Sequence, residues 1–347
     1  AFVTLSDLLL LTSGSEWKIS AGAKTDAVTP TSVSVSAQGY RGISEIEPVV
    51  IGNTVLFVQG RGSRVRDLGY TFENDAYTGS DLTVMASHLF EGHKIVDLAY
   101  QQEPDSVCWV ARDDGALLAL TYLREHDVIA WGRHPTDGKV ESVAVVPSPG
   151  GDVVHLCVLR RGKRCIETMT PASVTEAVEA FFVDSGVTVR GSNVTSVTGL
   201  ERLNGCTVTI VADGSLRNPQ VVANGRVTVS PAASVVHVGL PYVSKLETLD
   251  LNFARGDGAQ LTRKVRLASA TIRVENTRHL FAGTDEKHLR EYVDRTNESY
   301  NSPTRLSTGD WRVTLDSRYD SGRLVVVAPG AMPASIVAIV PEADPGD

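Results

Sequence analysis

The chain has 347 residues, 42% of them hydrophobic, and a formal net charge of −8. This length exceeds the usual size of one hydrophobic core, so two or three domains are expected. The longest apolar runs fall well short of the ~18 residues that a membrane-spanning helix needs. The acidic balance argues against general affinity for nucleic acid, which requires a basic face.

Four segments of the first half repeat one pattern: an apolar strand, a polar turn that contains glycine, and a second strand. They start at Leu8, Val55, Val107 and Val154, so the successive steps are 47, 52 and 47 residues. Asp114-Gly115 gives the strongest turn signal, and it predicts a type I′ hairpin with positive φ at both residues. A period in this range, with short strands, is typical of β-propeller blades.

Two further predicted strands flank most of these hairpins, which makes four strands per unit. The preceding strands cover 46–51, 95–100 and 140–146, and the following strands cover 32–36, 82–89 and 128–133. A blade cannot bury both faces alone, so the units must stack. About three and a half units are visible, fewer than the ~4–8 that close a ring. Because Ala1 falls within a strand pattern, we expect the chain to be a piece of a longer polypeptide.

The repeat ends near residue 170, and the composition changes afterwards. The predicted fold class is therefore all-β, with a partial β-propeller-like repeat of four-stranded blades followed by smaller β-domains. We expect blades over 1–170 and a small inserted β-module over 171–231. A C-terminal β-domain over 232–347 is expected to carry long charged loops and a disordered tail.

No catalytic or cofactor-binding motif is found in the sequence, which lacks a P-loop, a nucleophile elbow and an HExxH motif. His88 and His93 are five residues apart, which fits no common metal-ligand spacing. Asp113-Asp114-Gly115 lacks the alternating oxygen ligands of a calcium loop. We therefore expect a protein that is not an enzyme and has no metal or cofactor.

The four cysteines, Cys108, Cys157, Cys165 and Cys206, show no metal-binding spacing and are interpreted as free thiols in a reducing compartment. Cys157 and Cys165 flank one hairpin turn, so this pair is the one candidate disulfide.

Basic residues gather at two of the hairpins, and they are the candidate contact residues of the chain. The first group is Arg61, Arg64 and Arg66, and the second is Arg160, Arg161, Lys163 and Arg164. Three interpretations stay open for them: a solvated turn, salt bridges to an acidic neighbouring subunit, or contact with DNA phosphates.

Several turn and packing motifs of the first 170 residues form a set, and a further one lies at Val238–Tyr242. Those of the first part are Val55–Gln59, Asp81–Thr83, His88–Phe90, Gln101–Trp109, Asp114–Tyr122, Ala130–His134 and Asp137-Gly138. Together they resemble the tail nozzle proteins (tail tubular protein B-like) of short-tailed phages, or podoviruses.

The resemblance implies a structural virion protein that is assembled in the host cytoplasm. It implies a ring homo-oligomer, typically a hexamer, that binds the portal-side adaptor and other tail proteins. The lumen of this ring continues the DNA ejection channel without sequence-specific binding, and an acidic chain suits such a conduit. The alternative function is a glycan- or receptor-binding β-module of a phage tail, because β-propellers and small sandwiches often bind sugars at their loop faces.

Overall fold

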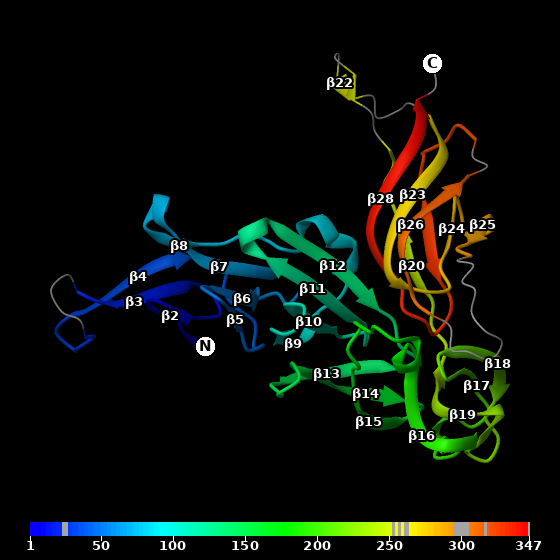
Figure 1. Ribbon diagram of the computed structural model, residues 1–347. Coiled ribbons are helices and arrows are strands. Elements are labelled where there is room, and N and C mark those ends of the chain that lie inside the picture. The colour runs from blue at the N-terminus through cyan, green and yellow to red at the C-terminus, as the bar shows by residue number, and fades with distance from the viewer. Residues whose placement is uncertain are drawn as a thin grey trace. The chain divides into compact units, whose positions relative to one another are not determined.

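The computed structural model describes residues 1–22, 27–251, 254–255, 258–259, 264–293, 305–315 and 318–345 (Figure 1). The chain is all-β, with 57% strand and 6% helix. It folds as two compact units, Ala1–Met169 and Thr170–Asp347. None of the helices in the described ranges has the length and apolar character needed to cross a membrane.

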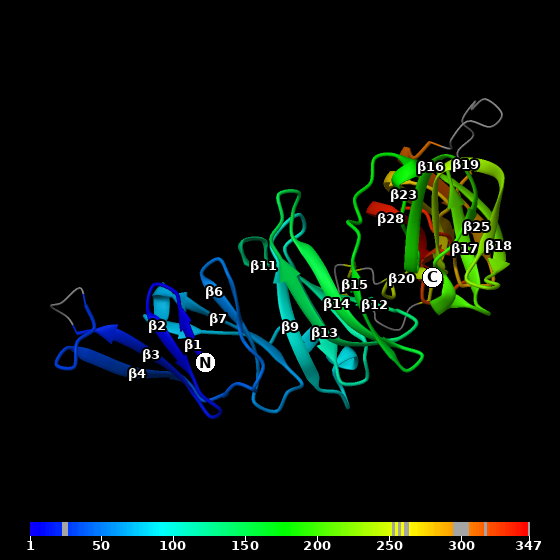
Figure 2. The ribbon, with the colours of Figure 1, turned by 90° about the horizontal axis from the view of Figure 1, so that it is seen from below.

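Among its described residues, the first unit has four antiparallel sheets, and their strands follow one another in chain order (Figures 1 and 2). Sheet 1 contains β1 (Phe2–Thr4), β2 (Leu8–Leu11), β3 (Glu16–Ala21) and β4 (Val33–Gly39). Sheet 2 contains β5 (Val49–Ile51), β6 (Thr54–Val58), β7 (Val65–Thr71) and β8 (Ala76–Thr78). Sheet 3 contains β9 (Ile95–Gln101), β10 (Val107–Arg112), β11 (Leu117–Leu123) and β12 (Val128–His134). Sheet 4 contains β13 (Lys139–Val146), β14 (Val153–Arg160) and β15 (Lys163–Thr168). The predicted repeat of four-stranded units is confirmed for sheets 1 to 3.

The sheets of the first unit stack through apolar cores, and strand β6 illustrates how its sequence allows this. All five of its residues are buried. Val55 and Phe57 pack in the core shared with sheet 1, whereas Leu56 and Val58 pack in the core shared with sheet 3. Side chains alternate between the two faces of a strand, so a continuous apolar run indicates a sheet that is covered on both sides. In β14 of sheet 4, only every second residue is buried.

The strand expected over 82–89 is wrong, because this segment forms the 3₁₀ helix η2 (Val84–Leu89) and the turns beside it. The fourth strand of sheet 2 is β8 instead. Leu82, Ala86 and Phe90 are the buried hydrophobic residues of the segment, and a spacing of four fits a helical turn better than a strand. The Asp81 carboxylate also accepts a hydrogen bond from the Thr83 N–H at 2.9 Å, which favours a turn.

The hairpin with positive φ at both central residues is not at Asp114-Gly115, where only Gly115 has a positive φ. Among the described hairpins of the first unit, the pair with this conformation is Arg161-Gly162, with φ of 50° and 78°, and in the second unit Asp213-Gly214 and Asn224-Gly225 have it as well. The Asp114 carboxylate accepts a hydrogen bond from the Ala116 N–H at 3.2 Å, which fixes the turn in another way. The other 3₁₀ turns of the first unit are η1 (Phe72–Asn74) and η3 (Arg124–His126).

The described residues of the second unit form three larger sheets. Sheet 5 contains β16 (Asp184–Val197), β17 (Thr207–Ala212), β18 (Ser215–Val221) and β19 (Val227–Leu240). Sheet 6 contains β20 (Ser244–Glu247), β24 (Phe281–Gly283), β25 (Leu289–Glu291) and β27 (Val325–Ala328). Sheet 7 contains β23 (Val265–Thr277), β26 (Ser307–Thr314) and β28 (Ser335–Pro345). Two short strands, β21 (Ala254–Arg255) and β22 (Gly258–Ala259), pair with each other. The 3₁₀ turns are η4 (Ala177–Glu179) and η5 (Glu201–Leu203).

Strand β19 has 14 residues and pairs with both β16 and β17. The expected division between 171–231 and 232–347 therefore lies inside a strand. Residues on both sides of it, such as Val229 and Val236, belong to one core. Sheets 6 and 7 share a second core, which includes Leu267, Ile272 and Val326.

The disordered tail expected from residue 341 onward is wrong for the described residues, because β28 continues to Pro345. Pro341 pairs with Ala270, and Ala343 pairs with Leu267. Strand β28 is an edge strand of sheet 7, where a proline can be accommodated because one side needs no partner. Residues 346–347 lie outside the described ranges, and so do residues 294–304 of the expected charged loops.

Candidate functional site

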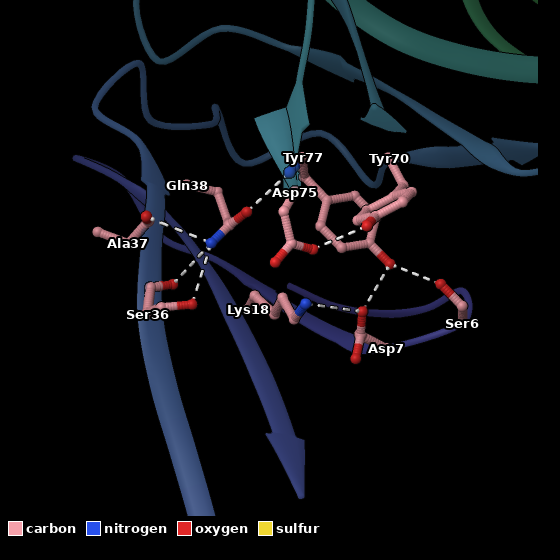
Figure 3. Close-up of polar contacts among 9 residues, drawn as sticks. All are labelled: Ser6, Asp7, Lys18, Ser36, Ala37, Gln38, Tyr70, Asp75 and Tyr77. Atoms are coloured by element: carbon pink, nitrogen blue, oxygen red, sulfur yellow. Dashed lines mark hydrogen bonds and ion pairs between the residues drawn. The ribbon is translucent and has the colours of Figure 1, made fainter. Parts of the chain in front are cut away.

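A buried polar network joins sheets 1 and 2 (Figure 3). Tyr77 is fully buried, and its hydroxyl donates to Asp7 Oδ2 at 3.1 Å. Ser6 Oγ lies 2.8 Å from the same hydroxyl, and the Tyr77 N–H donates to Gln38 Oε1 at 2.7 Å. Lys18 Nζ lies 3.4 Å from Asp7 Oδ2. A satisfied polar network of this kind fixes the packing of two sheets more narrowly than apolar contact alone.

The Lys18 ammonium also lies 5.9 Å from the ring centroid of Tyr70 and 6.0 Å from that of Tyr77. The two rings stand edge to face, with centroids 5.7 Å apart. A cation within about 6 Å of an aromatic face is attracted by the ring quadrupole. The junction thus holds a lysine between a carboxylate and two rings, and these contacts help to join sheets 1 and 2.

The next two junctions have polar contacts of the same kind. Between sheets 2 and 3, the Tyr122 hydroxyl donates to Asp67 Oδ2 at 2.9 Å, and burial raises the pKa of this phenol. The Trp131 indole N–H donates to the Leu82 carbonyl at 2.8 Å. Between sheets 3 and 4, the Val143 N–H donates to Asp97 Oδ2 at 2.9 Å. Each sheet of the first unit is therefore bonded to the next one.

The basic turn of β14 and β15 is bound largely to carboxylates of its own unit. Arg160 is buried, and its guanidinium donates to both Glu167 oxygens at 2.8 and 2.7 Å. Arg164 donates to the Glu141 carboxylate at 2.6 and 3.1 Å, which lowers the pKa of Glu141. Arg161 lies 3.7 Å from Asp137. Lys163 is exposed and has no ion pair within the described ranges.

The other basic group is at the turn between β6 and β7. Arg64 forms an ion pair with Asp81. The Arg66 guanidinium donates to the Gly79 carbonyl at 3.2 Å. Arg61 is exposed, and in the described part of the chain it has no ion pair. It lines a small hollow with Arg64, Gln59 and Ser63.

Taken together, the seven candidate residues do not form a free basic face. Four of the seven charges are paired with carboxylates of the same unit. Arg61, Arg66 and Lys163 lack an ion pair among the described residues, and of these three only Arg61 and Lys163 are exposed. A surface that grips DNA needs several unpaired cations directed at the phosphates. These residues can instead hold turns in place and offer two isolated positive charges to a partner.

No protein-family model and no curated protein matches this chain. The roles of these residues therefore follow from their own contacts.

His93 lies beside Asp113 and Asp114, which the sequence spacing did not indicate. Its Nδ1 is 3.3 Å from Asp113 Oδ1, and its Nε2 is 3.8 Å from Asp114 Oδ2. The two nitrogens thus face different carboxylates. Arg112 already binds both oxygens of Asp114 and lowers the pKa of that carboxyl to about 2. This cluster is an ion-pair network that joins the β10–β11 turn to the segment before β9.

The candidate disulfide between Cys157 and Cys165 is wrong, because both thiols are free. Cys157 pairs with Ile166, whereas Cys165 pairs with Val158. Directly opposed residues of an antiparallel pair share one face, so the two cysteines lie on opposite faces of sheet 4. Burial raises the pKa of the Cys108 thiol, which lies in the core between sheets 2 and 3.

Proposed function

We propose that this chain is a structural subunit of the tail nozzle of a short-tailed phage. It forms a ring homo-oligomer whose lumen continues the DNA ejection channel, and six subunits are what the resemblance implies. The observation that carries the proposal is the pairing of the candidate basic residues with carboxylates of their own unit, such as Arg160 with Glu167 and Arg164 with Glu141. With a net charge of −8, such a surface lets DNA pass without holding its phosphates.

The stacked sheets of the first unit support the same proposal. Their apolar cores and the polar contacts of Tyr77, Tyr122 and Asp97 join four sheets into one scaffold. A ring through which DNA passes under pressure needs subunits that keep their shape, and packed β-sheets with satisfied polar groups provide this. The function is mechanical and has no catalytic step.

The partners in this proposal are other copies of the chain, the portal-side adaptor and further tail proteins. The location is the virion, after assembly in the host cytoplasm. Arg61 and Lys163, which are exposed and have no ion pair in the described part of the chain, are available for contacts with an acidic neighbouring subunit.

Native mass spectrometry and negative-stain electron microscopy of the purified chain test the ring. We expect a closed homo-oligomer with one defined subunit number, both alone and with the portal-side adaptor. A chain that stays monomeric in both preparations would contradict the proposal.

Two binding measurements separate the nozzle from its alternative. Fluorescence anisotropy with duplex DNA at physiological salt is expected to show no binding tighter than the weak, non-specific range of about 10⁻⁴–10⁻⁶ M. A glycan array is expected to show no specific binder. Tight DNA binding would contradict the proposed role as a DNA conduit. Specific binding of one glycan would favour the alternative, a receptor-binding module.

A further inference from the structure

The outer face of sheet 1, which is the face away from sheet 2, is apolar. Its central rows are defined by strand pairing: Phe2 is opposite Leu10, and Leu10 is opposite Trp17. In the next row, Leu8 is opposite Ile19, and Ile19 is opposite Val35. The inner face carries Val3, Leu9 and Leu11, which are buried in the core shared with sheet 2.

This outer face is exposed to water. Phe2 is 70% exposed and Val35 is 55% exposed, while Leu8, Leu10, Trp17 and Ile19 are partly exposed. The strand residues that point to this side include no charged side chain in the described part of sheet 1. A contiguous apolar face of this kind on a soluble protein marks an interaction surface.

The described sheets inside the stack show what usually covers such a face. At the junction between sheets 3 and 4, Trp109 and small or aliphatic residues of sheet 3 pack against aliphatic residues of sheet 4, such as Val143 and Leu156. The outer face of sheet 1 has the same composition, with Trp17 among aliphatic residues and Ala37 opposite to it. Its complement is therefore another aliphatic sheet face.

Sheet 4 presents apolar residues on the side away from sheet 3, in the rows on either side of His155 and Thr168, which are opposite each other. Val146 is opposite Val153, and Cys157 is opposite Ile166. Ile166 is 75% exposed and Val146 is 50% exposed. At the rim of this face, Arg164 is paired with Glu141. Lys139, which is opposite Leu159, is exposed at the same rim and has no ion pair among the described residues.

We propose that the outer face of sheet 1 binds the outer face of sheet 4 of a second copy of this chain. The contact is head to tail, because it joins two different faces, and it continues the stack of sheets from one copy to the next. A contact of this class closes into a ring when its rotation allows and otherwise forms an open chain. The closure rests on the proposed function, whereas the contact itself rests on the two faces.

Charge substitutions on the two faces test this contact in the full chain. V35E and I166K each place a charge at an exposed position, so the fold should be unaffected. We expect each single variant to weaken self-association by roughly 100-fold or more, because the interface would bury an unpaired charge. S34E is the matched control, since Ser34 is exposed, adjacent in β4 and directed to the other side of the sheet. It should assemble as the wild type does.

The double variant V35E/I166K distinguishes the proposed contact from a symmetric one. In a head-to-tail contact, the new glutamate of one copy meets the new lysine of the next, so assembly should return at low ionic strength. If two copies of sheet 1 packed face to face, I166K alone would assemble normally and the double variant would stay dissociated. That pattern, measured by analytical ultracentrifugation, would overturn the proposal.

Cross-linking gives a second, independent readout. Cys157 lies on the outer face of sheet 4, so V35C should cross-link to the native Cys157 of another copy with a short bismaleimide. The control V35C/C157S should lose this product. If V35E still forms the ring and V35C gives no cross-linked product, this contact would be contradicted, whereas the nozzle proposal would stand. Open chains in place of rings would support the contact and contradict the nozzle, and a monomeric wild type would contradict both.

Discussion

The hydroxyl of Tyr77, in sheet 2, donates a hydrogen bond of 3.1 Å to the carboxylate of Asp7, in the turn that precedes β2 of sheet 1. The Tyr77 side chain is fully buried, so this bond lies at the centre of the junction between two sheets. Because the residues are 70 positions apart in sequence, the bond fixes the position of one sheet relative to the other.

The first prediction concerns this bond. Tyr77→Phe should lower the free energy of unfolding by about 1–3 kcal/mol, because the partly buried carboxylate of Asp7 loses a donor. Tyr70→Phe is the control: its hydroxyl donates to Asp75 at the surface, so the loss should stay within about 0.5 kcal/mol. Urea unfolding measures both. Equal losses of unfolding free energy in the two variants would show that the Tyr77–Asp7 hydrogen bond contributes no more than a surface hydrogen bond.

The second prediction separates Arg160 from its neighbour Lys163. Arg160→Ala should destabilise the chain by about 3–5 kcal/mol, because the buried guanidinium is the partner of Glu167. Lys163→Ala should change stability by no more than about 0.5 kcal/mol, since this side chain is exposed. Thermal or urea unfolding is the measurement. A stable Arg160→Ala variant would mean that the ion pair contributes little.

The third prediction concerns acid. The hydrogen bonds from the Arg112 guanidinium hold the pKa of Asp114 at about 2, below its ordinary value of 3.8. A lowered folded-state pKa contributes stability above the unfolded value, and this stability is lost as pH falls through the folded value. Asp114→Asn should therefore lose stability at neutral pH. Between about pH 4 and 2 its stability should also change less steeply than that of the wild type. If the free energies of unfolding of the wild type and of Asp114→Asn changed equally steeply with pH over that range, the prediction would be wrong.

The fourth prediction concerns His237 in the second unit. Burial lowers the pKa of this imidazole. Its Nε2 lies 2.9 Å from the Val178 carbonyl and its Nδ1 lies 2.8 Å from the Thr188 hydroxyl, which suits the neutral ring. The stability that this provides is present above the unfolded pKa of about 6.5 and is lost as pH falls below it.

Urea unfolding from pH 7.5 to 5 should therefore show falling stability, and His237→Gln should reduce this dependence. His288→Gln is the control, because the His288 side chain is 72% exposed. If the control variant flattened the curve instead, His237 would not be its source.

The fifth prediction concerns the thiols. Under mild oxidation, the monomer should form no bond between Cys157 and Cys165, because their side chains lie on opposite faces of sheet 4. Iodoacetamide should label both in the native monomer and leave Cys108 unlabelled, since the Cys108 thiol is buried and its pKa is raised. Peptide mass spectrometry decides. A Cys157–Cys165 peptide from native monomer would contradict the register of β14 and β15.

The hairpins of the first unit could be predicted from sequence because each has an apolar run, a glycine turn and a second run. The segment over 82–89 could not be assigned in this way. It is apolar enough for a strand, but its buried hydrophobic residues recur every four positions, and Asp81 stabilises a turn at its start. Local composition does not distinguish these cases, whereas the spacing of buried residues does.

The end of β28 was missed for a different reason. Its prolines and carboxylates are typical of a disordered tail, but the long strand β23 pairs with it, and Glu342 bonds with Arg312. Arg312 is 30 residues away from Glu342 in the sequence, so no local pattern indicates this pairing. The cysteine pair is the opposite case: once the turn is placed at Arg161-Gly162, Cys157 and Cys165 are one residue out of register, which the sequence alone could have revealed.

The burial of sheet 2 on both faces has a consequence for shortened forms of this chain. A version that starts after Gly39 would lose sheet 1 and expose Val55, Phe57 and Tyr77 to water, all of which are now at most 1% exposed. We expect such a version to form insoluble aggregates on expression, since each internal sheet depends on both of its neighbours for solubility. Soluble fragments are to be sought at the division between Met169 and Thr170, not between the stacked sheets.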